Sequence, residues 1–89
     1  MKAVISVIGK DHVGILSKVC GICAEHNVNV VEVTQSILED LFTMIMVVDI
    51  SDMTCKLSEL ADKMMELGQS LDLSVHVMHE DIFRSMHRI

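Results

Sequence analysis

The spacing of apolar residues along the chain predicts an alternation of strands and helices. Residues 2–9 are apolar on both alternating faces, which predicts an inner strand of a sheet. From Ile15 the apolar positions recur every three to four residues, and this period predicts a helix that ends near His26. Residues 28–38 and 42–50 then alternate as two strands joined by a polar turn.

The second half of the sequence predicts a longer helix, a fourth strand and a tail helix. Apolar residues recur at helical spacing from Leu57 to Leu71, and Gly68 either ends this helix or is tolerated inside it. Residues 73–77 alternate as a strand. Residues 80–89 are expected to form a short amphipathic helix that begins at an acidic turn.

Polar residues indicate where the two longer helices begin. Asp11 is expected to cap the first helix, and residues 51–54 offer several N-cap oxygens to the second. In the strand at residues 28–38, strict alternation places Val30 beside Glu32 on one face and Val31 on the other.

The resulting order, βαββαβ with a helical tail, predicts an α+β fold of the ferredoxin-like kind. Right-handed crossovers place both helices on one face of a four-stranded antiparallel sheet. The first and fourth strands are then adjacent or one strand apart. The other face of such a sheet needs a cover, because a packed domain buries the apolar side of each layer.

Size and composition indicate one domain that associates with a copy of itself. The chain has 89 residues, of which 51% are hydrophobic, and it has no proline or linker-like stretch, so residues 1–89 are expected to form a single domain. Folding a chain of this length buries about 64% of its unfolded surface, which is marginal for a monomer. A homodimer is therefore expected.

Charge and cysteine content exclude several classes of function. The net charge is −6 and only two residues are aromatic, which opposes direct binding to nucleic acid. No apolar run approaches the ~18 residues that a membrane span requires, and the N-terminal residues lack a signal-peptide pattern. Three cysteines do not make a complete disulfide framework, so a cytoplasmic location is expected.

Two segments resemble the ACT domain family of small regulatory modules that bind amino acids. They are GKDHVGIL at residues 9–16, which opens the first helix, and AEHNVNV at residues 24–30, which leads into the second strand. The usual ACT pattern has Arg-Pro where this chain has His12 and Val13. The tail at residues 79–89 further resembles that of stand-alone bacterial and archaeal ACT proteins.

This resemblance implies a ligand site between the loop before the first helix and the second strand of a neighbouring subunit. A glycine in the first turn lets a ligand approach the backbone, and a helix N-terminus favours a carboxylate. The alternative is that the glycine permits a tight turn and the aspartate caps the helix. Carried over by position, the candidate ligand-binding residues are Asp11, His12, Val13, Gly14, Ile15, Asn27 and Asn29.

Two other groups of residues suggest metal or redox chemistry, but both have a simpler interpretation. Cys20 and Cys23 form a C-x-x-C motif, yet both lie inside the first predicted helix on its apolar stripe, which favours buried core residues. His79 and His87 flank two acidic residues and could converge if the tail folds back, but no helical metal motif supports this. No metal and no cofactor are expected.

The sequence therefore favours a regulatory homodimer that binds an amino acid or similar ligand and acts on another protein. The alternative is a module for dimerisation or protein interaction that binds no ligand. A small enzyme resembling acylphosphatase, or a metal carrier, has less support. The acylphosphatase chemistry needs an arginine in the first loop, where this chain has Lys10 and His12, so no enzymatic activity is expected.

Overall fold

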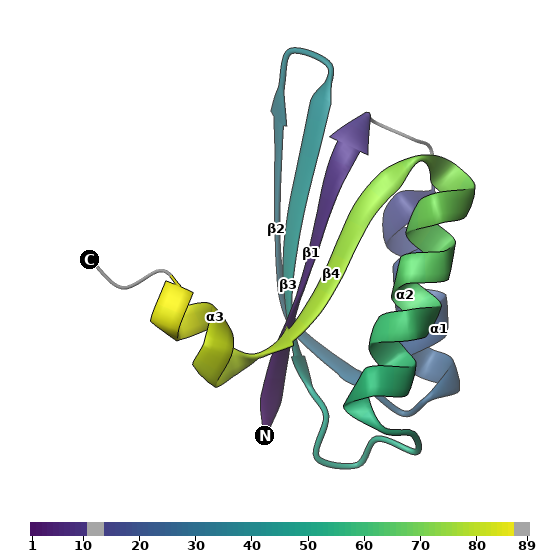
Figure 1. Ribbon diagram of the computed structural model, residues 1–89, viewed down its shortest axis with the longest axis vertical. Helices are drawn as coiled ribbons and strands as arrows, with labels where there is room; N and C mark the ends of the chain where they lie inside the picture. The colour runs from purple at the N-terminus through teal and green to yellow at the C-terminus, as the bar shows by residue number, and fades with distance from the viewer. Residues whose placement is uncertain (11–13, 87–89) are drawn as a thin grey trace.

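The computed structural model describes residues 1–10 and 14–86 of the chain. Its elements follow one another in the order predicted from the sequence (Figure 1). They are β1 (Lys2–Lys10), α1 (Ile15–Glu25), β2 (Asn29–Leu38), β3 (Leu41–Asp49), α2 (Leu57–Leu71), β4 (Leu73–His79) and α3 (Glu80–Met86).

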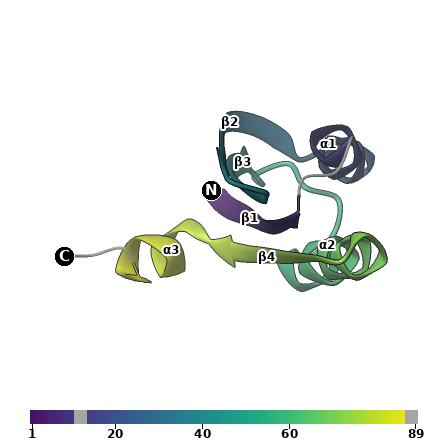
Figure 2. The same cartoon turned by 90° about the horizontal axis from the view of Figure 1, so that it is seen from above.

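The four strands form one antiparallel sheet in the order β2-β3-β1-β4. β1 is therefore an inner strand, as predicted, and it lies directly beside β4. Helices α1 and α2 cover one face of the sheet, while α3 lies on the other side of it (Figures 1 and 2). This arrangement confirms the ferredoxin-like fold with a short C-terminal helix.

The hydrophobic core lies between the sheet and the two helices. Buried side chains alternate with exposed or half-buried ones along β3 and at the start of β4, as the strand period requires, whereas in β1 Val4 on the opposite face is buried as well. The nine largest side chains with less than 2% of their surface exposed come from β1, β3, α1 and α2. They are Ile5, Val7, Val19, Cys23, Met44, Met46, Val48, Leu60 and Met64.

A β-bulge at Val31 changes the faces of β2. Val30 pairs with Val48 and Glu32 pairs with Val47, so two residues of β2 span one step of β3. Val30 therefore lies on the helix-covered face, while Glu32 lies on the opposite face. The expectation that Val30 and Glu32 share a face is wrong, because the extra residue reverses the alternation.

The helix α2 begins later than its polar start signal indicates. Its N-cap is Lys56, whose backbone N–H donates to Glu59 Oε1 over 3.3 Å, so the expected cap within residues 51–54 is wrong. Two hydrogen bonds instead fasten that loop to the end of α1: Thr54 N–H donates to the His26 carbonyl, and Asn27 Nδ2 donates to the Asp52 carbonyl. The polar groups of the loop at residues 51–54 therefore hold α1 and α2 in place.

Gly68 lies inside α2, where the helix packs closely on β4. A Cβ atom at this position would lie 2.7 Å from the Leu73 carbonyl oxygen and 2.9 Å from Val75 Cγ2. Both distances are shorter than ordinary packing allows. Gly68 is therefore tolerated inside the helix because the approach of the helix to the strand leaves no room for a side chain.

Candidate functional site

Gly14 forms the N-cap of α1 and leaves the start of the helix accessible. Its φ of +84° is in the left-handed region, which glycine adopts without strain. Among the residues that the structure describes, no heavy atom lies within 4 Å of a Cβ atom placed there, so they leave the space beside it open. The first turn of α1 contains no acidic residue, and its N–H groups lack acceptors within the helix. This end of α1 can therefore receive an anionic group.

The loop residues Asp11, His12 and Val13 lie outside the described residues, so their expected contacts, including capping by Asp11, stay predictions. Ile15 follows Gly14 and is only 3% exposed, with its side chain in the core. Only the backbone N–H of Ile15 faces the start of the helix. Its side chain therefore stabilises the fold rather than lining a ligand site.

Asn27 and Asn29 lie at the opposite end of α1 from Gly14. The helix has 11 residues, which at 1.5 Å per residue separates its ends by roughly 16 Å. Asn27 has a φ of +56°, and its side chain is occupied by the hydrogen bond to the loop before α2. Asn29 is exposed and pairs with Asp49 at the far end of the sheet. One chain therefore does not bring the two halves of the predicted site together.

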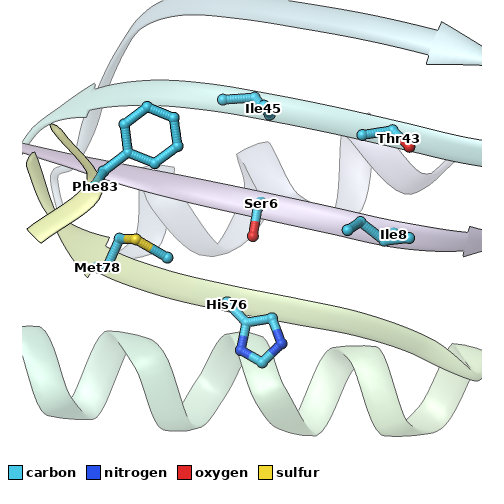
Figure 3. Close-up of a pocket in the computed structure, with 7 residues that line it drawn as sticks. All are labelled: Ser6, Ile8, Thr43, Ile45, His76, Met78 and Phe83. Carbon is cyan, nitrogen blue, oxygen red and sulfur yellow. The ribbon is translucent and has the colours of Figure 1, made fainter. Parts of the chain in front are cut away.

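The sheet face opposite α1 and α2, called the uncovered face below, contains a pocket of about 420 Å³ that the sequence did not reveal. Most of its lining is apolar, with Phe83 of α3 at one end (Figure 3). Three polar side chains, Ser6, Thr43 and His76, come from three different strands. Ser6 pairs with both Ile45 and His76, so the strand order brings these positions together. That order cannot be read from any one segment.

A smaller pocket of about 230 Å³ lies on the same face near the bulge of β2. Its apolar floor includes Val4 and Val47, and four charged residues surround it. The exposed Arg84 and the half-buried Glu80 form an ion pair on α3, with 3.5 Å between Nη2 and Oε2. The charged residues are Lys2, Glu32, Glu80 and Arg84.

The cysteines lack the surroundings of a reactive or metal-binding pair. Cys23, on α1, lies in the hydrophobic core with 1% of its surface exposed, as predicted. Cys20, on the same helix, is half-buried. Burial, with a smaller contribution from the nearby Cys20, raises the pKa of the Cys23 thiol to about 11. Because the thiolate is the form that attacks or binds metal, a thiol held protonated at neutral pH suits neither role.

The histidines likewise form no cluster among the residues that the structure describes. His76 and His79 lie on opposite faces of β4, since His79 pairs with Ala3 and His76 with Ser6. His79 Nδ1 accepts the backbone N–H of Asp81 over 3.2 Å. His87 lies outside the described residues. Within residues 1–10 and 14–86, no three His, Cys, Asp or Glu side chains could hold a metal ion together.

Comparison with known proteins identifies the family. The family model for the ACT domain matches residues 2–78. A UPF0237 protein of Clostridium perfringens is 49% identical over 89 residues, which is 100% of both chains. A UPF0237 protein of the archaeon Methanopyrus kandleri is 40% identical over 88 residues, covering 99% of this chain and 98% of the relative.

Solved structures show the same fold. An ACT domain protein from Streptococcus pneumoniae superposes with a TM-score of 0.80 at 36% identity, with 93% of each chain covered. A formyltetrahydrofolate deformylase from Burkholderia mallei gives a TM-score of 0.78 at 15% identity, over 88% of this chain and 28% of that one. In the described residues no helix is long and apolar enough to cross a membrane. The chain belongs to the ACT domain family, a family of ligand-binding regulatory modules.

Proposed function

We propose that residues 1–89 form a single ACT domain that works as a homodimer, binds a small amino acid and transmits its occupancy to another protein. The observation that carries this proposal is the open start of α1 at Gly14, where the positive φ and the free space leave the backbone accessible. Family membership supports it, since ACT domains commonly bind amino acids and dimerise. The three free cysteines favour a reducing, cytoplasmic location.

In this proposal the carboxylate of the ligand accepts hydrogen bonds from N–H groups in the first turn of α1. The partial positive charge of the helix N-terminus favours such a carboxylate. Asp11 then serves the ammonium of the ligand. Asn29 of a second copy approaches a polar group of the ligand from the start of β2. A second copy is needed because Gly14 and Asn29 lie at opposite ends of one chain.

The second candidate function is a dimerisation module that binds no small molecule. The side chain of Asn27 favours it, because this amide already donates to the Asp52 carbonyl and holds a turn in place. In that case Gly14 serves the turn before α1. Neither candidate includes a catalytic step.

A thermal-shift screen with the standard amino acids, followed by calorimetric titration with the one that shifts the melting point most, separates the two functions. A ligand at ~100 times its Kd adds about 2.7 kcal/mol to the free energy of unfolding. Gly14→Val and Asp11→Asn are expected to lower the affinity at least tenfold. Gly21→Ala is the matched control, because Gly21 lies exposed on the same helix with no heavy atom near its missing Cβ.

Valine at position 14 strains the backbone, so circular dichroism must show that the variant is folded. Asp11→Asn tests the same loop without changing a glycine. Unchanged affinity in both folded variants would place the site elsewhere. No shift with any amino acid for the wild-type chain would favour the dimerisation module.

A further inference from the structure

The larger pocket of the uncovered face has the size of a small-molecule site. Its floor consists of side chains from β3, β1 and β4, and Phe83 of α3 stands at one end of it (Figure 3). Because α3 follows β4 directly, the tail of the chain gives this sheet face a wall. The volume of about 420 Å³ lies within the range of about 300–1,000 Å³ that small-molecule sites occupy.

Three polar side chains of this pocket lie close together and have unused hydrogen-bonding capacity. Ser6 pairs with His76 on one side and with Ile45 on the other, which places the first two side chains roughly 5 Å apart. Thr43 lies two residues from Ile45, diagonally across from Ser6 at roughly 7–8 Å. Within the part of the chain that the structure describes, none of these polar side chains hydrogen-bonds to another protein group. Their hydroxyl and imidazole groups can therefore donate to a ligand and accept from it.

The charge of the lining decides which ligands the pocket favours. Among the described residues that line it, none is a lysine, arginine, aspartate or glutamate, whereas four such residues surround the smaller pocket beside it. A carboxylate or an ammonium group in the larger pocket would leave water without meeting an opposite charge, which is costly. The pocket therefore favours an uncharged ligand, unlike the start of α1, which favours a carboxylate.

The apolar end of the pocket is suited to a flat ring. Phe83 and Met78 lie together at this end, while Ser6 and His76 lie further along the strands (Figure 3). Aromatic rings pack well against another ring and against a thioether sulfur. A molecule with an aromatic part and a polar edge would therefore match both ends of the pocket.

We propose that this pocket is a second ligand site, which takes an uncharged aromatic molecule whose ring carries both a hydrogen-bond donor and an acceptor. The ring packs against Phe83 and Met78, and its polar edge meets the side chains of Ser6, Thr43 and His76. The site lies on the other side of the sheet from α1 and is independent of the amino-acid site at Gly14. A ligand there would also hold α3 against the sheet, because α3 supplies Phe83.

Titration of the isotope-labelled chain with quinolin-2-one, followed by NMR, tests this site. Quinolin-2-one is an uncharged bicyclic lactam with one N–H donor and one carbonyl acceptor. It is expected to shift the amide signals of β1, β3 and β4 around Ser6, Thr43 and His76, and to leave those of Ile15 to Lys18 at the start of α1 unchanged. Quinoline-2-carboxylate is the matched control ligand, because it keeps the bicyclic ring and adds a negative charge. At the pocket it is expected to bind at least tenfold more weakly.

Three variants locate the binding of quinolin-2-one. Ser6→Leu fills the middle of the pocket and is expected to raise the Kd at least tenfold. Thr43→Val keeps the shape of the side chain but removes its hydroxyl group, and is expected to raise the Kd about threefold. Thr54→Val is the matched control, because Thr54 is exposed in the loop before α2, where its backbone N–H donates to His26 at the end of α1. It is expected to leave the Kd unchanged.

The outcomes separate this pocket from the amino-acid site. Absence of any shift around the pocket at millimolar quinolin-2-one, or equal affinity in folded Ser6→Leu, would overturn the proposed site. Shifts confined to the start of α1 would also overturn it and would assign the ring to the amino-acid site. Equal binding of the carboxylate at the pocket would overturn the preference for an uncharged ligand. If Ser6→Leu loses its circular dichroism signal, Thr43→Val alone decides.

Discussion

Two glycines in helices show how position decides the role of the same residue. Gly21 of α1 is exposed, and a Cβ atom there would meet nothing within 4 Å. Gly68 of α2 is buried, and a Cβ atom there would overlap with backbone and side-chain atoms of β4. Glycine weakens the interior of any helix, so Gly21 costs stability without a packing reason, while Gly68 permits the contact between α2 and β4.

Replacing each glycine by alanine is therefore expected to change the stability in opposite directions. Gly21→Ala raises the free energy of unfolding by about 0.5–1 kcal/mol, because alanine is the better helix former. Gly68→Ala lowers it by about 1–3 kcal/mol, because the added methyl group overpacks the contact with β4. Urea denaturation followed by circular dichroism, at one protein concentration, measures both. Equal stabilisation by the two substitutions would contradict the close packing at Gly68.

At the scale of elements, periodicity predicted the helices from their one apolar face, and it predicted β1 from apolar residues on both of its faces. It did not predict the bulge at Val31. β2 mixes apolar and polar residues on both faces, so one extra residue does not visibly interrupt its pattern. The start of α2 was also missed. The polar residues 51–54 look like caps, but the protein uses the backbone of that loop to reach His26 and Asn27.

The candidate site was predictable only where it depends on local structure. Gly14 at a helix start follows from the loop sequence, and its positive φ agrees with that prediction. The pocket with Ser6, Thr43 and His76 depends on the order of the strands, which brings together residues up to 70 positions apart. Local patterns do not contain that information.

The helix α3 attaches to the sheet mainly through Phe83, which is half-buried and lines both pockets of the uncovered face. Phe83→Ala is expected to lower the free energy of unfolding by about 1–3 kcal/mol, less than for a fully buried ring. Ser85→Ala, at an exposed position of the same helix, is expected to change it by less than about 0.5 kcal/mol. Thermal unfolding of both variants checks this. Equal stabilities would show that α3 does not pack on the domain.

At the scale of the whole molecule, the domain is thin. It measures 36 × 34 × 19 Å, and the shortest extent runs across the four strands, since Figure 1, which looks down the shortest axis, shows α3, the sheet and the two longer helices side by side. A two-layer domain of 89 residues has a small core, and large apolar side chains remain exposed on both sides of the sheet, among them Ile8 and Ile82 on one side and Ile37 and Met65 on the other. Burying this surface against a second copy would therefore add appreciably to the stability.

If the dimer forms, the melting temperature must depend on the protein concentration. Each tenfold increase in concentration adds about 1.4 kcal/mol to the free energy of unfolding of a dimer. Between about 1 and 100 μM, the wild-type melting temperature is expected to rise by roughly 5–10 °C. A wild-type melting temperature independent of concentration would argue against dimerisation.

The position of β1 between β3 and β4 has a consequence for how the chain folds during synthesis. β1 leaves the ribosome before both strands that flank it, and one of its edges can pair only when residues 41–49 have been made. Its other edge remains unpaired until residues 73–79 emerge, since Ser6 pairs with His76. Such distant pairings form slowly, and an unpaired apolar edge can pair with another chain. A nascent or truncated chain that stops before β4 therefore exposes, as a site for aggregation, the strand that is most protected in the finished domain.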